Sequence, residues 1–253
     1  NFEEDLKYVI QQFKAEGITD LILDLRFNNG GSVELARYLA ASIAGTSHRS
    51  DVFMKMQRNS GADEYIRFGD GDDLNLNSVR IICSEETASA SELIINGLRG
   101  IDFPVKLFGS RTEGKNVGME VQEYKYGNKY YEFAPITFRS FNAKDWGDYA
   151  SGMDPDVMLN NQNSDYEDDI DNVFPYAFGD WDNFDFNYPL YWALCDVQGV
   201  DPTTGEPVKR SGRSGMTRSQ QDEIIRVPSV PLKRPVGTFG SLIYNKPEVE
   251  NLY

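Results

Sequence analysis

A serine lies where a predicted strand gives way to a predicted helix. Residues 86–92 read Glu-Thr-Ala-Ser-Ala-Ser-Glu and join an apolar run to an amphipathic one. Ser89 is therefore expected at a helix N-terminus, where free backbone N–H groups and the helix dipole favour negative charge. Acyl transfer needs an attacking oxygen close to donors that can hold an oxyanion. A second interpretation stays open, because Ser89 and Glu92 also have the spacing of a capping box, a common helix start.

A glycine-rich segment with one lysine follows the next predicted strand. Residues 109–118 read Gly-Ser-Arg-Thr-Glu-Gly-Lys-Asn-Val-Gly. In a parallel α/β unit the strand ends gather at one edge, so Lys115 is expected to return beside Ser89. An amine that burial keeps neutral can act as a general base. The segment also has P-loop spacing, but Asn116 replaces the magnesium-binding Ser or Thr and a β-rich stretch follows, which disfavours nucleotide binding.

A third segment, residues 24–31, reads Asp-Leu-Arg-Phe-Asn-Asn-Gly-Gly and follows an apolar run. Paired glycines at a strand end let the backbone approach a ligand closely. The N–H groups of Gly30 and Gly31 could supply the second half of an oxyanion hole. The alternative is an ordinary strand-to-helix turn in which Asp24 and Arg26 brace the loop by hydrogen bonds.

Other catalytic chemistries have few residues to draw on. His48 is the only histidine and lies in a polar connection after a predicted helix, so we interpret it as a surface residue. With one histidine and two distant cysteines, Cys83 and Cys195, no zinc site is expected. Cys83 is predicted to be a buried small hydrophobe. The acidic residues 165–185 lack EF-hand spacing, which disfavours calcium, so neither a metal nor a cofactor is predicted.

The composition excludes some partners. A formal charge of −15 repels nucleic acid and anionic lipid. No apolar run is long enough to span a bilayer, so no transmembrane segment is predicted. A peptide or protein substrate is the expected partner, and the sequence leaves the oligomeric state open.

The order of predicted elements indicates an α/β fold with βαβ units and an antiparallel extension. Gly127-Asn128 between two β-rich runs predicts a hairpin. The predicted helices cover residues 2–16, 33–43, 91–98 and 189–197, and the predicted strands cover residues 21–25, 51–57, 64–68, 79–83, 105–108, 121–126, 129–138 and 240–244. Residues 201–235 are interpreted as a linker or mobile loop.

Together, these segments resemble peptidase family S41, the tail-specific or C-terminal processing proteases. Residues 24–31, 87–92 and 109–115 match its strand-turn, nucleophile and lysine motifs, and residues 152–156 match a later Gly-x-x-Pro-Asp segment. The resemblance spans residues 20–157. It implies a ClpP/crotonase-like core and a serine endopeptidase that acts on peptides or protein C-termini. It also implies work outside the cytoplasm, in the periplasm or cell envelope.

The resemblance assigns roles to individual positions. Ser89 would be the nucleophile and Lys115 its base. The N–H groups of Ala90 and Gly31 would form the oxyanion hole. Substrate would lie as an added strand beside the segment after the lysine, in contact with three residues, Gly30, Val117 and Gly118.

Two positions depart from the family pattern. A glutamine expected four residues after the lysine is Met119 here, so the candidates for orienting the lysine are Glu120 and Gln122 nearby. An aspartate expected eleven residues after the serine is Gly100, with Asp102 close to it. The alternative function is therefore a non-catalytic binding module for a peptide or a hydrophobic ligand.

The predicted domain division is a catalytic core over residues 1–160, followed by an acidic loop, helix, linker and closing segment over residues 161–253. The family's N-terminal strands and a PDZ-like domain are not apparent in these residues. The first residue is Asn1 and not Met, and no signal peptide is visible, so the chain is interpreted as a processed form or a fragment.

Overall fold

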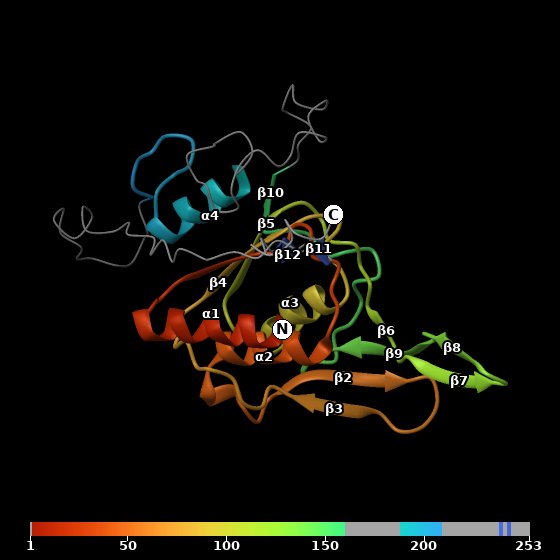
Figure 1. Cartoon of the computed structure of the whole chain (residues 1–253). Helices are drawn as coiled ribbons and strands as arrows, with labels where there is room; N and C mark the ends of the chain where they lie inside the picture. The colour runs from red at the N-terminus through yellow and green to blue at the C-terminus, as the bar shows by residue number, and fades with distance from the viewer. Residues whose placement is uncertain (1, 160–187, 209–237, 240–241, 244–253) are drawn as a thin grey trace, which may run out of the picture. The chain divides into compact units, whose positions relative to one another are not determined.

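The computed structural model describes residues 2–159, 188–208, 238–239 and 242–243. The chain divides into two compact units, Asn1–Asn160 and Asn161–Tyr253. Figure 1 shows the helices and strands of both.

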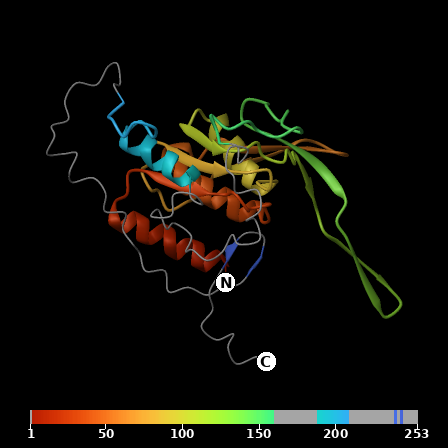
Figure 2. The same cartoon turned by 90° about the horizontal axis from the view of Figure 1, so that it is seen from above.

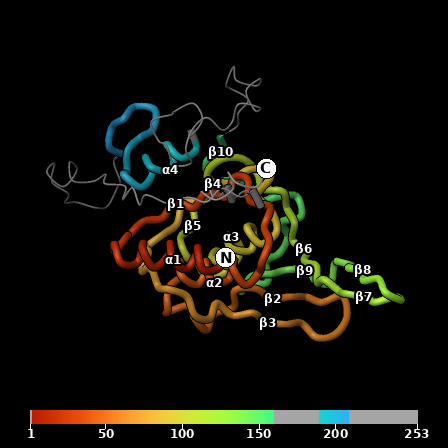
Figure 3. The backbone as a smooth tube through the Cα atoms, in the orientation of Figure 1, coloured from red at the N-terminus to blue at the C-terminus, as the bar shows by residue number. Residues whose placement is uncertain are grey.

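A parallel sheet forms one layer of the first unit. Its strands are β1 (Leu21–Asp24), β4 (Val79–Cys83), β5 (Val105–Gly109) and β10 (Val157–Met158), in the order β1-β4-β5-β10. Every residue of β4 is buried, as expected for a central strand covered on both faces. The predicted βαβ arrangement is confirmed, and the parallel register brings the ends of β1, β4 and β5 to one edge (Figure 3).

An antiparallel sheet forms a second layer. Its strands are β2 (Val52–Arg58), β3 (Glu64–Arg67), β6 (Val117–Met119) and β9 (Ile136–Phe141), in the order β3-β2-β9-β6. β6 is therefore an edge strand that pairs with β9 alone.

The helix α3 (Ala90–Gly100) lies between the two sheets (Figures 1 and 3). It contacts β5 of the parallel sheet, β2 of the antiparallel sheet and the helix α2 (Val33–Ala44). Nearly all of its residues are buried, so it is the centre of the core. The helix α1 (Phe2–Glu16) packs three side chains against the same core, namely Leu6, Ile10 and Phe13.

The predicted hairpin around Gly127-Asn128 is present as β7 (Gln122–Tyr126) and β8 (Lys129–Phe133). One boundary was wrong: the predicted strand 129–138 is two strands, β8 and β9, separated at Ala134 and Pro135. Proline has no N–H to donate to a ladder, which accounts for the break. A second difference is β6, a short strand over residues 117–119 that the prediction left out, since the predicted strand begins at residue 121.

The second unit contains the helix α4 (Tyr188–Gln198), which confirms the predicted helix 189–197. The strands β11 (Thr238–Phe239) and β12 (Leu242–Ile243) pair antiparallel within it, and β12 lies inside the predicted closing strand. The acidic segment 165–185 and most of the predicted linker lie outside the described residues. In the described part of the chain, no helix has both the length and the apolar character needed to cross a bilayer.

The end of β5 depends on a glycine. Gly109 has φ +120, and a Cβ there would lie 2.1 Å from the carbonyl oxygen of Cys83. We expect Gly109→Ala to lower the free energy of unfolding by about 3 kcal/mol or more, from backbone strain and overlap together. Gly17→Ala is the control, because Gly17 also has positive φ but open space around it. Urea unfolding of the two variants measures the difference, and equal losses would contradict the close approach.

Candidate active site

Ser89 sits at the junction between the loop after β4 and the first turn of α3. Its backbone has φ 55° and ψ −117°, a combination that side-chain-bearing residues seldom adopt. Such a conformation costs on the order of 1–3 kcal/mol and persists only where the surroundings enforce it. The residue is half-buried. The contacts around Ser89 must therefore supply that constraint.

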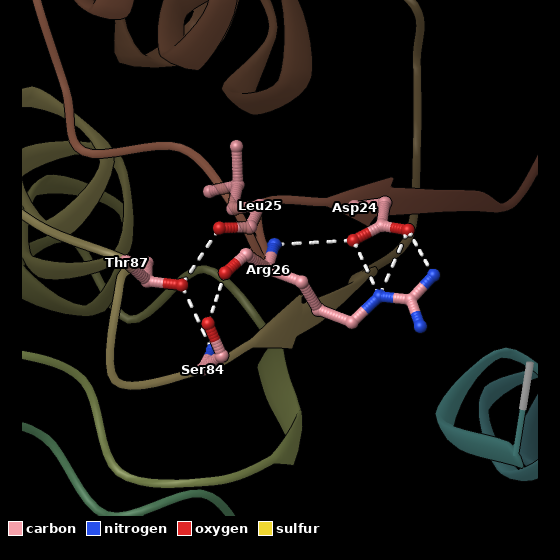
Figure 4. A network of polar contacts seen from close by, with 5 residues as sticks. All are labelled: Asp24, Leu25, Arg26, Ser84 and Thr87. Carbon is pink, nitrogen blue, oxygen red and sulfur yellow. Dashed lines mark hydrogen bonds and ion pairs between the residues drawn. The ribbon is translucent and has the colours of Figure 1, made fainter. Parts of the chain in front are cut away.

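The strand-turn segment after β1 is bonded to the loop that precedes Ser89 (Figure 4). Thr87 Oγ1 donates to the carbonyl of Leu25 at 2.7 Å and accepts from the N–H of Ser84 at 2.9 Å. The Ser84 hydroxyl donates to the carbonyl of Arg26. The buried Arg26 in turn donates from its guanidinium to both carboxylate oxygens of Asp24, with Nη2 to Oδ2 at 2.6 Å. This confirms the prediction that Asp24 and Arg26 brace the loop.

Asn28 fastens the same turn to the nucleophile segment. Its carbonyl accepts from the N–H of Ala88 at 3.1 Å. Its side-chain Oδ1 accepts from the Ser91 hydroxyl at 2.9 Å and from the N–H of Gly30 at 3.0 Å. Asn28 thus connects the glycine turn to the residues before and after Ser89.

Gly30 lies directly against the serine. Its φ is +101°, and a Cβ at this position would lie 2.7 Å from Ala90 N and 2.8 Å from Ser89 Cβ. The turn can come this close only because residue 30 has no side chain. Gly31 follows, exposed and with φ +134°. Gly30 of the strand-turn and the N–H of Ala90, the first residue of α3, are therefore neighbours.

Glu92 binds both loops of the site through one carboxylate. The residue is fully buried. Its Oε1 accepts from Thr112 Oγ1 at 2.6 Å and from the N–H of Gly114 at 2.8 Å. Its Oε2 accepts from the N–H of Ser89 at 2.9 Å and from the N–H of Lys115 at 2.8 Å. Burial raises the pKa of Glu92, and the four donors oppose that shift. A capping box explains only the bond from Ser89 N, and the other three hydrogen bonds of Glu92 come from the lysine loop.

Glu92 Oε2 accepts from both predicted catalytic residues, so the backbone nitrogens of Ser89 and Lys115 lie close together. Because Ser89 N and Lys115 N bind the same Oε2 at 2.9 and 2.8 Å, the two nitrogens are at most 5.7 Å apart. A further backbone bond, from Glu113 N to the Thr87 carbonyl at 3.1 Å, holds the two loops together. Lys115 is half-buried. The distance is well within the reach of a lysine side chain.

The Gly-x-x-Pro-Asp segment supports the lysine loop from the other side. Thr112 N donates to the carbonyl of Met153 at 3.1 Å, and Met153 N donates to Thr112 Oγ1 at 2.8 Å. Asp156 accepts from the N–H of Leu107 in β5 at 2.8 Å and from Arg99 of α3 at 3.2 Å. The Thr112 hydroxyl donates to the Glu92 carboxylate, which can only accept, and the bond that it accepts from Met153 N fixes its orientation.

Two of the candidates for orienting the lysine lie after β6. The Glu120 carboxylate is bound by Arg58, whose Nη1 lies 3.0 Å from each of its oxygens. That guanidinium lowers the pKa of Glu120. Gln122 is exposed at the start of β7. Among the described residues, neither side chain is bonded to Lys115, so an orienting role for either stays a prediction.

Asp102 lies beyond the other end of α3. Ser89 precedes this helix and Asp102 follows it, and 11 helical residues span about 16 Å. The Asp102 carboxylate is exposed and forms an ion pair with Lys144. The structure thus places Asp102 at the far end of α3 from the nucleophile, and its predicted orienting role has no supporting contact.

Val117 and Gly118, the predicted substrate contacts after the lysine, belong to the edge strand β6. A Cβ on Gly118 would overlap the ring of Phe138 on β9, so this glycine lets the aromatic side chain pack against β6. The open side of β6 begins two residues after Lys115 and could accept an added strand.

Competing nucleophiles and bases lie elsewhere or are inert. His48 follows α2 and pairs with Asp51 through Nδ1 at 2.7 Å, about 18 Å along the helix from the strand-turn. Cys83 is buried, as predicted, and burial raises the pKa of its thiol to about 12. Over the described ranges, no group of three or more His, Cys, Asp or Glu is placed to hold a metal ion.

Comparison with known proteins identifies the family. The model of peptidase family S41 matches residues 1–159. The chain belongs to peptidase family S41. A probable CtpA-like serine protease of Staphylococcus haemolyticus is 25% identical over 162 residues, which are 63% of this chain and 31% of the relative. One from Staphylococcus aureus strain COL is 26% identical over 181 residues, which are 70% of this chain and 35% of the relative.

A solved structure shares the fold. The crystal structure of a protein from Bacteroides fragilis assigned to the S41 proteases has a TM-score of 0.64 and 25% identity. The match covers 78% of this chain and 49% of that one. The chain spans about a third of the length of the curated relatives that it matches. The family and the predicted α/β fold class are thereby confirmed.

Sequence reasoning missed two residues of the site. Glu92 was predicted only as the partner in a capping box, although its carboxylate also binds the lysine loop. Asn28 was named as part of a motif without a role, and it bonds to the nucleophile segment. The only available signal was a carboxylate in an otherwise apolar helix face, which implies buried partners.

The role of Glu92 can be tested by removing one acceptor. In Glu92→Gln an NH₂ group would face two of the four donors, leaving them buried without an acceptor. We expect the free energy of unfolding to fall by about 2–4 kcal/mol, from on the order of 1–3 kcal/mol for each donor. The control is Glu113→Gln, because Glu113 is exposed in the same loop. Urea unfolding that gave the same stability for both variants would contradict this role.

Proposed function

We propose that this chain is the catalytic core of a serine endopeptidase that cleaves peptides or protein C-termini with a Ser89–Lys115 pair. The observation that carries the proposal is the shared bond to Glu92 Oε2, which keeps Ser89 N and Lys115 N at most 5.7 Å apart. Membership of family S41 supports the same chemistry. CtpA-like serine protease is the name of the curated relatives.

The first chemical step is acylation of the serine. Ser89 Oγ attacks the carbonyl carbon of the scissile peptide bond, and its proton passes to the amine of Lys115. The tetrahedral intermediate then expels the amine of the leaving peptide, which takes the proton from the Lys115 ammonium. An ester between Ser89 and the acyl part of the substrate remains.

Water completes the cycle. A water molecule gives a proton to Lys115 as its oxygen attacks the ester carbonyl, and collapse of the second intermediate returns that proton to Ser89 Oγ. The products are a carboxylic acid and the free enzyme. The lysine acts as base and then acid in both halves, so no other titrating group is required.

The oxyanion of each intermediate needs donors that are fixed before the reaction. The N–H of Ala90 is the first of α3, where backbone donors lack acceptors inside the helix. The N–H of Gly31 is the second proposed donor, since Gly30 packs against Ala90 and Ser89. Loss of one such donor costs on the order of 10²–10³ in kcat in other acyl-transfer enzymes.

The bonding around the serine supports this assignment. Its positive φ is maintained by Asn28, which binds Ala88 and Ser91, and by Glu92, which accepts from its N–H. The preceding loop is held to the strand-turn by the bond from Thr87 to Leu25. Strain of this kind clusters at functional sites, where the surroundings over-determine the backbone. A serine that served only to begin a helix would need none of the bonds to the lysine loop.

One observation favours a second candidate, a binding module without turnover. Within the described residues no carboxylate or amide is bonded to the amine of Lys115, and the two carboxylates that were candidates are bound by Arg58 and Lys144. A site of this kind would bind an extended peptide along β6 and leave it intact.

The proposal predicts a sharp difference between four variants. We expect Ser89→Ala to lower kcat/KM on unfolded protein substrates at least about 10⁴-fold, and Lys115→Met to lower it at least about 10²-fold. The controls are Ser60→Ala in an exposed loop and Lys144→Met at the far end of α3. Both controls should stay within about twofold of the parent rate.

Mass spectrometry after treatment with an activated acyl probe gives an independent readout. An adduct on Ser89 that disappears in Lys115→Met supports the pair. Cleavage at the parent rate by Ser89→Ala would rule out the serine as nucleophile. Saturable peptide binding without either turnover or an adduct would favour the binding module.

A further inference from the structure

The β7–β8 hairpin extends away from the two sheets of the first unit, as both Figure 1 and Figure 2 show. Every residue of its two strands is exposed. A two-stranded hairpin alone is marginally stable in water and usually packs one face on a core. This hairpin therefore presents two faces that the described part of its own chain leaves uncovered.

One face of the hairpin is aromatic. Residues directly opposite one another on the two strands share a face, and the register pairs Tyr124 with Tyr131 and Gln122 with Phe133. Four aromatic residues lie on this face, here called the aromatic face: Tyr124, Tyr126, Tyr131 and Phe133, which are 60%, 70%, 42% and 56% exposed. Gln122 and Lys129 share it. At about 200 Å² for each aromatic side chain, this is roughly 450 Å² of uncovered surface. Contiguous patches of that size on soluble proteins mark interaction sites.

The opposite face, here called the charged face, consists of Glu123, Lys125, Tyr130 and Glu132. Lys125 lies over the ring of Tyr130, with its Nζ 5.0 Å from the centroid. Glu123 and Glu132 are directly opposite each other, which is unfavourable for like charges. Neither has a cationic partner in the part of the chain that the structure describes. A cation supplied by a partner would relieve this repulsion.

The open edge of β7 follows the open edge of β6, the strand that begins two residues after Lys115. The chain runs from β6 directly into β7, and returns from β8 into β9 (Figure 3). β6 pairs only with β9, and β7 only with β8, so both have an open side. From Val117 to Tyr126 the chain spans at most about 30 Å, at 3.3 Å per residue. A chain held beside β6 would reach the hairpin within a few residues.

We propose that the β7–β8 hairpin is a docking arm for an extended polypeptide in which apolar and basic residues alternate. Successive side chains of an added strand point to opposite faces. Apolar residues of the docked segment would then cover the aromatic face while basic residues reach Glu123 on the charged face. The inference rests on the proposed function, because the docked segment belongs to the substrate and lies several residues from the scissile bond.

Charge favours this occupant over a second copy of the chain. The protein carries a formal charge of −15, so two copies repel one another, whereas a cationic segment is attracted. The charged face itself points the same way, because its two glutamates outnumber its one lysine.

Binding to the arm can be measured without turnover. The probe is a fluorescent 20-residue peptide of alternating Leu and Lys, titrated into the full chain carrying Ser89→Ala and followed by anisotropy. Tyr124→Ser with Tyr131→Ser removes a cross-strand pair from the aromatic face. Tyr8→Ser with Tyr65→Ser, the matched control, removes two similarly exposed tyrosines from α1 and β3, outside the hairpin. We expect the first double variant to raise Kd at least tenfold and the control to change it less than threefold.

The charge requirement is tested separately. Glu123→Gln with Glu132→Gln should raise Kd for the Leu-Lys peptide and flatten its dependence on salt, and a Leu-Glu peptide should bind at least tenfold more weakly to the parent chain. Equal Kd values for the aromatic-face variant and its matched control would contradict the proposed docking arm. Concentration-dependent dimers of the parent chain that vanish in the aromatic-face variant would overturn it in favour of a second copy.

A turnover assay separates failure of the arm from failure of the proposed function. On a hexapeptide too short to reach β7, the aromatic-face variant should keep the parent kcat/KM, while a long unfolded substrate should show a raised KM. Cleavage of both substrates at parent rates would leave the peptidase intact and refute the arm. Binding that depends on the arm without any cleavage would refute the peptidase and leave the arm standing.

Discussion

The carboxylate of Glu92 is buried in the centre of the first unit, and its two oxygens accept hydrogen bonds from four donors. A buried charge is tolerated only when its hydrogen bonds are complete. Two of those donors come from the lysine loop's main chain, one from its threonine hydroxyl and one from the serine's own N–H. Both loops must therefore adopt their observed backbones together, or the charge is left without partners. The separation of serine and lysine is a consequence of this requirement.

The rest of the first unit keeps that carboxylate buried. α3 lies between a parallel and an antiparallel sheet, so Glu92 on its first turn is shielded from water on both sides. The strand-turn after β1 closes over the serine because Gly30 has no side chain. The Gly-x-x-Pro-Asp segment fixes the Thr112 hydroxyl that donates to Glu92. The packing of α3, the close approach of Gly30 and the hydrogen bonds to Glu92 thus all constrain the backbone around Ser89.

Much of this was readable from the sequence. Apolar runs such as 79–83 identified the buried strands, and Gly127-Asn128 identified the hairpin, because both signals are local. The contacts of Glu92 and Asn28 with distant loops could not be read in the same way, since they depend on the register of three strands. The division of one predicted strand into β8 and β9 followed from Pro135, whose effect the alternation of side chains concealed. The exposed aromatic face of the hairpin required the cross-strand register.

The most direct test of the central claim is a crystal structure of the chain with a peptide boronate bound to Ser89, in which the distance from Ser89 Oγ to Lys115 Nζ is measured. The account predicts a separation within hydrogen-bond reach, with the boronate oxygen held by the N–H groups of Ala90 and Gly31. A Lys115 amine that points into solvent, with Ser89 acting only as the cap of α3, would contradict it.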